Sequence, residues 1–331
     1  MKILITGGSG FIGIHIAEEA LRREMEVWVA VRKSTSRRYL TDDRLHFIEL
    51  DFNDEEQMLG QLSSHTFDYV VHAAGVTKCI HQADFHKINT LGTQHFVGAL
   101  LRSGMPIKRF VYLSSLSVFG AIHEKQPYVP ITAEDTPQPN TAYGKSKLDA
   151  EAFLDSVKDR LSVVTLRPTG VYGPREKDYF MMATSIKNHV DFAAGWKRQD
   201  ITFVYVKDVV AAVFLALTNG ESGSKYFLSD GAVYQSATFS NLLRKELGHP
   251  WLIRIKSPIW LLRVVTFIGE YYGRITGNIT ALNNDKYHIL RQRNWQCDIT
   301  PAIEELGYQP QYDLQRGVEE TVAWYKANGW L

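Results

Sequence analysis

Residues 2–13 read K-I-L-I-T-G-G-S-G-F-I-G, a short apolar run rich in β-forming residues that is followed at once by glycines. A helical pattern continues from Ile12 to Arg23, and the apolar run V-W-V-A-V follows at 27–31. A strand, a glycine-rich turn that opens a helix, and a second strand together make a βαβ unit. Such units build parallel sheets with helices on both faces, so this stretch sets the fold class.

The same alternation continues along the chain. Further apolar runs lie at His46–Leu50, Tyr69–His72, Phe110–Leu113 and Val163–Leu166. Segments long enough for crossover helices lie between them, such as Glu55–Leu62 and Thr90–Leu101. Runs that are apolar throughout indicate strands buried on both faces of a sheet. We therefore predict an α/β fold with a Rossmann-type, doubly wound parallel sheet.

After Gly173 the strand patterns become less regular and aromatic residues become more frequent. Helical patterns there cover 206–218, 240–247, 258–276 and 317–328. We predict a nucleotide-binding domain over 1–173 and a smaller, mixed α/β substrate lobe that takes up most of 174–331. One strand and one helix near 200–218 are expected to return to the first domain.

Composition indicates which partners the protein can bind and in which compartment it is expected to reside. The chain carries 37 basic and 36 acidic residues, a net charge of +1, so no strong field attracts it to nucleic acid, and we expect no nucleic-acid partner. Cys79 and Cys297 lack metal-ligand spacing, and we expect two reduced thiols and no metal site. The apolar strand that follows Met1 and Lys2 does not resemble a signal peptide. We therefore expect a cytoplasmic protein.

The glycines at Gly7, Gly10 and Gly13 sit between a strand and a helix. In such a loop the first glycine permits a tight turn, the second lets the backbone approach a pyrophosphate, and the third lets helix and strand pack closely. The phosphates would face the positive end of the helix dipole. We predict a dinucleotide site here, with Phe11 and Ile12 among its contacts.

The end of the second strand run bears on which dinucleotide binds. An acidic residue there would hold the ribose hydroxyls of NAD, but Val31 is followed by Arg32 and Lys33. Guanidinium groups suit a 2′-phosphate, so the sequence favours NADP(H), with NAD(H) and a merely solvated basic loop as the alternatives. Asp51 and Phe52 end the third strand run. They are predicted to contact the adenine, although Asp51 is equally typical of a turn.

Tyr143 and Lys147 lie four residues apart in Y-G-K-S-K, which places them on one face of a helix. A phenol has a pKa of about 10, and a nearby ammonium lowers that pKa, so the tyrosine can exchange a proton as hydride moves. A strand run that ends in serines, Y-L-S-S-L-S-V-F-G at 112–120, supplies a hydroxyl for the reacting oxygen. The alternatives are a chance pair on a helix and a serine that caps the next segment.

Together these motifs make the chain similar to the extended short-chain dehydrogenases/reductases. The matching pieces are T-G-G-S-G-F-I-G at 6–13, H-A-A-G at 72–75, I-N-T-L-G-T around Asn89, S-S-L-S-V-F-G at 114–120, Y-G-K-S-K at 143–147 and R-P-T-G-V-Y-G-P at 167–174. They occur in the family's order and span most of the chain.

The resemblance implies a role for each matching position. Ser115, rather than Ser114 or Ser117, becomes the catalytic serine, Tyr143 the acid/base, and Lys147 the residue that holds the nicotinamide ribose. The cofactor is lined by Ala73, Ala74, Gly75, Asn89 and Pro168. The helices expected at 90–102 and 143–158 resemble the pair that forms homodimers in many relatives.

Two departures from the nucleotide-sugar branch of the family stand out. These enzymes carry Asn where this chain has Gly170, and that Asn binds the diphosphate of the sugar nucleotide. They also keep an acidic residue after the second strand, where this chain has Arg32 and Lys33. The basic pair is more similar to reductases of the dihydroflavonol and 3β-hydroxysteroid type, which consume NADPH.

Residues 251–273 are rich in aliphatic and aromatic side chains, with Arg254, Lys256 and Arg263 among them. Such a segment suits a lid over a lipid- or sterol-like substrate, or a peripheral membrane contact. The alternative is a helix packed on the core of its own lobe.

Three functions follow from the sequence. The first is an NADP(H)-dependent oxidoreductase that acts on a hydrophobic ketone or alcohol. The second is a nucleotide-sugar 4-epimerase or dehydratase with tightly bound NAD. The third is a non-catalytic NADP(H)-sensing protein, against which Ser115, Tyr143 and Lys147 argue.

Overall fold

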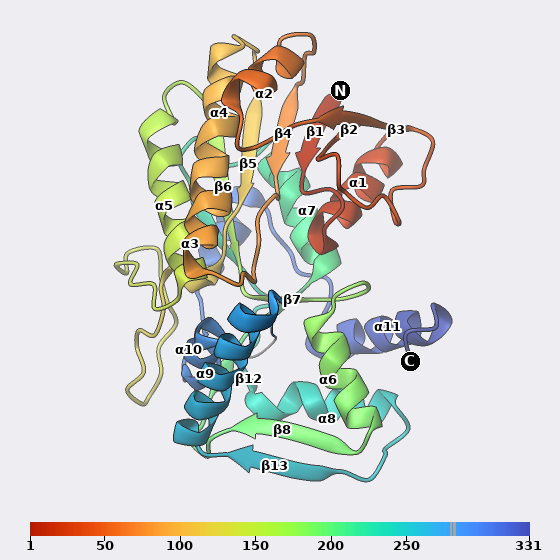
Figure 1. Cartoon of the computed structure of the whole chain (residues 1–331), viewed down its shortest axis with the longest axis vertical. Helices are drawn as coiled ribbons and strands as arrows, with labels where there is room; N and C mark the ends of the chain where they lie inside the picture. The colour runs from red at the N-terminus through yellow and green to blue at the C-terminus, as the bar shows by residue number, and fades with distance from the viewer. Residues whose placement is uncertain (279, 281–282) are drawn as a thin grey trace.

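The computed structural model describes residues 1–278, 280 and 283–331, and it is built around one seven-stranded sheet (Figure 1). Every neighbouring pair of strands in this sheet is parallel. The predicted doubly wound, Rossmann-type sheet is confirmed. In order across the sheet, the strands are β11 (Lys225–Leu228), β6 (Val163–Pro168), β5 (Arg109–Leu113), β4 (Tyr69–His72), β1 (Lys2–Thr6), β2 (Glu26–Val31) and β3 (Leu45–Glu49).

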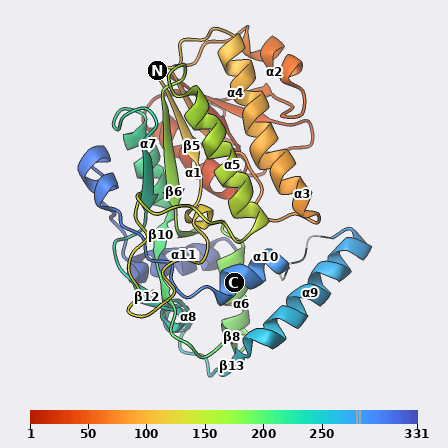
Figure 2. The ribbon, with the colours of Figure 1, turned by 90° about the vertical axis from the view of Figure 1, so that its left-hand side faces the viewer.

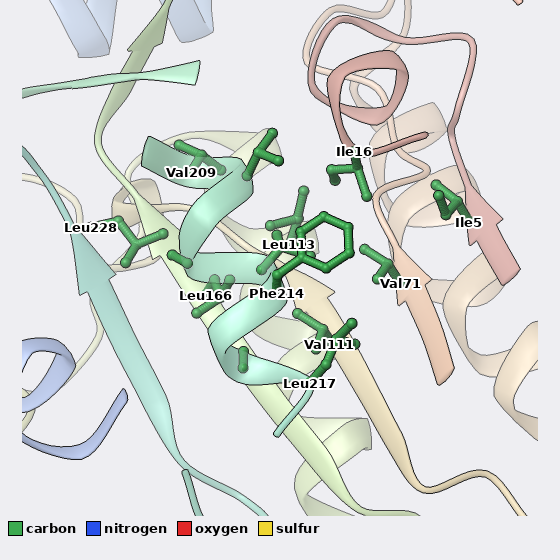
Figure 3. Packing of buried hydrophobic residues seen from close by; sticks show 14 of the residues in the cluster. Ile5, Ile16, Val71, Val111, Leu113, Leu166, Val209, Phe214, Leu217 and Leu228 are labelled. Atoms are coloured by element: carbon green, nitrogen blue, oxygen red, sulfur yellow. The ribbon is translucent and has the colours of Figure 1, made fainter. Parts of the chain in front are cut away.

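Helices cover both faces of the sheet because each strand sends alternate side chains to opposite sides. In β1, Ile3 and Ile5 join one buried cluster, whereas Leu4 joins another. The first cluster is covered by α1 (Phe11–Arg22) and α7 (Val206–Ala216), and Figure 3 shows Phe214 of α7 and Leu217, the residue after the helix, over the sheet. The second cluster is closed by α2 (Glu55–Leu62), α4 (Gly92–Arg102) and α5 (Ala142–Val157).

The helix expected at Thr90–Leu101 is longer than its pattern indicates. α3 (Gln82–Phe85) leads directly into a π-helical segment, η1 (His86–Leu91), and then into α4. A π-helix inside an α-helix shifts the side-chain register and is common at functional sites. Here it carries Asn89, which is buried.

The remaining elements form the smaller part of the structure below the large sheet (Figure 1). Its three two-stranded sheets pair β7 (Gly170–Tyr172) with β10 (Phe203–Tyr205), β9 (Asp200–Ile201) with β12 (Tyr234–Gln235), and β8 (Val190–Ala194) with β13 (Ile253–Ser257). Its helices are α6 (Asp178–Lys187), α8 (Ser236–Glu246), α9 (Ile259–Thr276), α10 (Asn284–Arg291) and α11 (Leu314–Ala327). Two short helical segments complete the chain, η2 (Leu116–Val118) after β5 and η3 (Ala302–Leu306) before α11.

The strand near 200–218, which was expected to return to the first domain, does not join the large sheet. β10 pairs with β7, outside that sheet, and the strand that returns is β11, which pairs with β6. The expected helix does return, because α7 buries Val209, Val213 and Phe214 in the core beneath the sheet. The three residues of β10 end where α7 begins. The division of the chain at residue 173 stays a prediction.

Candidate active site

The glycine loop joins the carboxyl end of β1 to the first turn of α1. Gly7 has a φ of +71°, and a Cβ atom there would lie 2.6 Å from the carbonyl group of Ala73. A Cβ atom at Gly13 would lie 2.1 Å from the Gly7 carbonyl oxygen. Both distances are shorter than a carbon atom can tolerate, so each position requires glycine. The loop thereby packs directly against the turn that follows β4.

The N-terminus of α1 is clear of side chains. Gly10 occupies the position before the helix, and no side chain caps the first turn, which begins with Phe11 and Ile12. Free N–H groups at a helix start bind anions, and the helix dipole favours negative charge there. The residues present therefore fit the pyrophosphate of a dinucleotide.

The turn after β4 carries Ala73, Ala74 and Gly75 beside this loop. The Ala74 N–H donates to the Thr6 hydroxyl at 3.2 Å. A Cβ atom at Gly75 would lie 3.3 Å from the Lys147 ammonium nitrogen. The turn thus connects the glycine loop to the helix that carries Tyr143 and Lys147.

Asn89 holds this turn in place. Its side-chain oxygen accepts from the Val76 N–H at 2.8 Å, and its amide donates to the Val76 carbonyl and the Ser146 hydroxyl, both at 3.0 Å. Both amide hydrogens are therefore engaged by protein groups. In this structure Asn89 positions the turn and α5, and its predicted contact with the cofactor stays a prediction.

The basic residues after β2 are exposed. Lys33 faces Glu49 with 3.9 Å between Nζ and Oε1, whereas Arg32 makes no ion pair with any residue that the structure describes. Asp51 lies nearby: hydrogen bonds from the backbone and side chain of Asn53, together with the positive charge of Arg32, lower its pKa. Arg32 is thus a free cation close to the predicted adenine contact.

Phe52 follows Asp51 and is partly buried. Its ring lies 5.4 Å from that of Phe96, centroid to centroid, and its carbonyl accepts a hydrogen bond from His95. These contacts with α4 fix the end of the strand run that the sequence assigns to the adenine side.

Tyr143 and Ser115 meet at the carboxyl end of β5. Tyr143 stands in the first turn of α5, and Ser115 lies beside it with its hydroxyl donating to the Ser117 hydroxyl at 3.1 Å. Burial raises the pKa of Tyr143 to about 12, and the nearby Ser115 hydroxyl acts in the opposite direction. Tyr143 therefore holds its proton at neutral pH.

The neighbouring serines have other partners. The Ser114 hydroxyl donates to Glu151, which also forms a buried ion pair with Arg167. Ser115 also accepts a hydrogen bond from the Ser117 N–H at 3.1 Å and thereby caps η2. This agrees with the alternative interpretation of a serine that caps the next segment. Of the three serines, Ser114 is thus turned away from Tyr143 and Ser115 is turned toward it.

Lys147 lies one turn after Tyr143 and is buried. Its ammonium donates to the Leu113 carbonyl at 2.8 Å and lies 4.8 Å from the centre of the Tyr112 ring. Burial lowers the pKa of Lys147 to about 8, and the Glu151 carboxylate acts in the opposite direction. The expected lowering of the Tyr143 pKa by Lys147 is not seen, because burial dominates at both residues.

The order of these elements matches a known family. The model of the NAD-dependent epimerase/dehydratase family matches residues 3–228, from β1 to β11. The chain belongs to this family. The resemblance to extended short-chain dehydrogenases/reductases is thereby confirmed, and with it an enzyme of the dehydrogenase, epimerase and dehydratase kind.

Relatives in the family match over nearly their full length. The dTDP-glucose 4,6-dehydratase of Actinoplanes sp. is 28% identical and covers 99% of this chain and 98% of its own. The decarboxylating sterol-4-alpha-carboxylate 3-dehydrogenase of Candida albicans is 25% identical, with 98% and 97% covered. The crystal structure of DesIV, a dTDP-glucose 4,6-dehydratase from Streptomyces venezuelae with NAD and TYD bound, shares the fold with a TM-score of 0.81 at 23% identity, with 100% and 98% covered.

Gly170 begins β7, just after Pro168, which is buried at the end of β6 beside Leu228. A Cβ atom at Gly170 would lie 2.6 Å from the Tyr179 hydroxyl. Tyr179, from α6, therefore occupies the room that a side chain at residue 170 would need. Burial raises the pKa of Tyr179, so this hydroxyl stays neutral. The sequence identifies Gly170 as a departure from the family's sugar-nucleotide branch, but only the structure shows what replaces the missing side chain.

Asp285 is a residue of the site that the sequence analysis missed. It is buried in α10, and its carboxylate accepts from the Ala142 N–H at 3.2 Å and the Tyr143 N–H at 3.1 Å. Thr141 caps the same helix end through the Gly144 N–H. A carboxylate at a helix N-terminus is favoured by the dipole. The C-terminal part of the chain thus fixes the first turn of the helix that carries Tyr143.

We expect Asp285→Ala to lower kcat at least tenfold and to leave the Kd for the dinucleotide within about twofold, because small displacements of a reacting group are costly. Kinetics and cofactor titration test this. Asp313→Ala is a matched control, since Asp313 caps α11 in the same way at 2.8 Å from the Arg316 N–H. An equal loss of kcat in both variants would show that Asp285 acts only on stability.

Proposed function

We propose that this protein is an NADP(H)-dependent oxidoreductase that moves a hydride to or from a ketone or alcohol carbon of a hydrophobic small molecule. The observation that carries the proposal is the protonated Tyr143, which lies beside Ser115 and stands one turn before Lys147. A tyrosine with a pKa of about 12 is suited to give a proton to an oxygen that becomes negative as its carbon gains a hydride.

Each residue of the site has a separate role in the reduction of a carbonyl group. When bound, the nicotinamide cofactor supplies the hydride. Ser115 orients the carbonyl oxygen by hydrogen bonding, and Tyr143 transfers its phenolic proton to that oxygen. Lys147, one turn further along α5, would hold the nicotinamide ribose, and water then returns the proton to Tyr143. The glycine loop, with Gly7, Gly10 and Gly13, holds the pyrophosphate, and Pro168 backs the nicotinamide.

The preference for NADP(H) rests on Arg32, whose guanidinium lies near Asp51 and forms no ion pair within the part of the chain that the structure describes. We expect Arg32→Ala to raise the KM for NADPH about tenfold or more and to leave the KM for NADH nearly unchanged, because a charge-assisted bond to the 2′-phosphate is lost. Steady-state kinetics with both cofactors measure this. Arg44→Ala is the matched control, since Arg44 is exposed but paired with Asp42 at 2.7 Å. Equal effects on NADH and NADPH would contradict the preference.

The preference for a hydrophobic substrate is supported by Gly170 and Tyr179. An Asn at residue 170 would hold a sugar-nucleotide diphosphate in the related branch, but here the Tyr179 hydroxyl fills that room. The deciding experiment incubates the protein with NADPH and a panel of long-chain and sterol-like ketones, and follows NADPH oxidation at 340 nm. Turnover of at least one such ketone is the expected result.

A nucleotide-sugar 4-epimerase or dehydratase is the second candidate, favoured by relatives such as the Actinoplanes dehydratase. It requires NAD that survives purification and is recycled. Mass spectrometry of the purified protein together with thermal shifts on UDP- and dTDP-sugars separates the two candidates. Retained NAD and a clear shift with one sugar nucleotide would overturn the reductase proposal. A homodimer through α4 and α5 stays a prediction, which light scattering tests.

A further inference from the structure

α9 turns its apolar side outward. Only a narrow stripe with Leu262, Thr266 and Gly273 is buried. Six large apolar side chains on the other side are exposed, and at 3.6 residues per turn they share an arc of roughly 100°. They are Trp260, Val264, Phe267, Ile268, Tyr271 and Ile275. A surface helix of a water-soluble domain ordinarily shows the reverse arrangement, so the predicted alternative of a helix packed on its own core is wrong for this face.

The exposure is extensive. Phe267 is 71% exposed, and Trp260 and Ile275 are each 68% exposed. Figures 1 and 2 show α9 on the outside of the molecule, beside α10 and away from the seven-stranded sheet. None of the helices in the described part of the chain could cross a membrane. The face is therefore suited to lie along a surface.

The β8–β13 pair, next to the start of α9, also carries exposed apolar side chains. Ile255 is paired with Phe192, so their side chains share one side of this small sheet, and they are 42% and 65% exposed. Arg254 points to the other side, where it contacts Asp191 and Asn241 of α8. β8 ends against α9, because a Cβ atom at Gly195 would lie 3.2 Å from Ile259. We call the outward sides of α9 and of this strand pair the α9 surface.

Most aromatic residues of the α9 surface are tryptophan and tyrosine, whose side chains combine an apolar ring with a polar group. Three of the seven tryptophans of the chain, Trp196, Trp251 and Trp260, lie on or next to it and are more than 60% exposed. Tyr271 and Tyr272 are similarly exposed. Tryptophan and tyrosine are enriched at the interface between lipid and water, where an apolar ring and a polar group are both satisfied.

The charge of this segment is positive. Residues 251–278 contain four basic residues and one acidic residue, a net charge of +3, although the whole chain carries only +1. Lys256 and Arg263 have no carboxylate within 4.0 Å in the described part of the chain. A second copy of this chain would bring the same positive charge to a two-fold contact. Anionic lipid headgroups complement it instead.

We propose that the α9 surface rests on a lipid bilayer that contains anionic lipids, with the apolar side chains in the headgroup region. An amphipathic helix with basic residues beside its apolar face binds membranes in this way. α9 packs against α10, whose Asp285 holds the first turn of α5. A docked bilayer would thus lie near Tyr143 and could deliver a lipid substrate. This last step rests on the proposed function, whereas the docking does not.

Flotation of the full chain with vesicles tests the docking. We expect binding to vesicles of phosphatidylcholine and phosphatidylglycerol (7:3), and at least tenfold less binding to phosphatidylcholine alone or in 1 M salt. Phe267→Asp/Ile275→Asp should lower binding at least tenfold, and Lys256→Glu/Arg263→Glu should abolish the preference for anionic lipid. Ile303→Asp is the matched control, because Ile303 is exposed on η3, outside the α9 surface.

The outcomes are distinct. No binding, or equal binding by Phe267→Asp/Ile275→Asp and the control, would overturn the docking. The docking would also be overturned if the unaltered protein bound no vesicles and formed a dimer in light scattering that Phe267→Asp/Ile275→Asp converts to a monomer. The α9 surface would then be an interface between two copies of the chain. Turnover of a short, water-soluble ketone should be unchanged in Phe267→Asp/Ile275→Asp. Vesicle binding without turnover of any ketone by the unaltered protein would leave the docking intact and refute the oxidoreductase proposal alone.

Discussion

Tyr143→Phe is expected to lower kcat for ketone reduction by about 10²- to 10⁴-fold, the usual contribution of a positioned proton donor. The hydroxyl that is removed is the one beside Ser115, and its pKa of about 12 keeps it protonated at neutral pH. Phenylalanine fills the same space, so the Kd for NADPH and the unfolding temperature should change little. Steady-state kinetics, fluorescence titration with NADPH and thermal unfolding measure the three quantities.

Tyr69→Phe is the matched control for this substitution. Tyr69 is buried at the start of β4, at the opposite end of the sheet from Ser115, and should lose no activity. Full turnover in Tyr143→Phe would contradict the assigned proton donor. A protein that turns over no substrate, with or without this change, and still binds NADPH would favour a sensing role instead.

Gly13→Ala should have the second large effect. The new Cβ atom would lie 2.1 Å from the Gly7 carbonyl oxygen and 2.8 Å from the Gly8 Cα. Backbone atoms cannot rotate away as a side chain can, so α1 must move from the loop. We expect a loss of about 3 kcal/mol in the free energy of unfolding, the upper part of the usual range for overpacking. The Kd for NADPH should rise more than tenfold, because the helix start no longer faces the pyrophosphate.

Gly60→Ala gives the matched control, because Gly60 lies inside α2 and its Cβ atom would meet nothing within 4 Å. Alanine there should stabilise the protein by about 0.5–1 kcal/mol and leave the Kd unchanged. Denaturant unfolding and NADPH titration compare the two variants. If Gly13→Ala kept normal affinity, the glycine loop would not be the pyrophosphate site.

The first half of the fold follows closely from sequence patterns. The strands expected at Lys2–Thr6 and Tyr69–His72 and the helix at Glu55–Leu62 have the predicted bounds. Errors arise where a cap or a partner sets the boundary. α11 begins at Leu314 rather than Gly317, because Asp313 caps it. α10 was not predicted, although Asn283 caps it through the Lys286 N–H and the N-N-D stretch at 283–285 marks its start.

In the candidate site, too, some features follow from the local sequence and others depend on contacts between distant segments. The four-residue spacing of Tyr143 and Lys147 guarantees that they share a helix face, whatever the rest of the chain does. The distinction between Ser114 and Ser115 requires Glu151 and Arg167, which reach the strand end from α5 and β6. The sequence analysis chose Ser115 by resemblance, and the physical reason for a difference between the two serines lies in that buried ion pair.

The sequence by itself determined the βαβ unit, the glycine loop, the basic residues after β2 and the spacing of Tyr143 and Lys147, because each depends on periodicity or on neighbours within a few residues. The tertiary structure alone decided that Asp285 caps a helix 142 residues earlier in the chain. It also decided that the Tyr179 hydroxyl fills the room beside Gly170 and that α9 exposes its apolar face. A sequence pattern shows that a side chain is apolar or charged, but its burial depends on which distant segments pack against it.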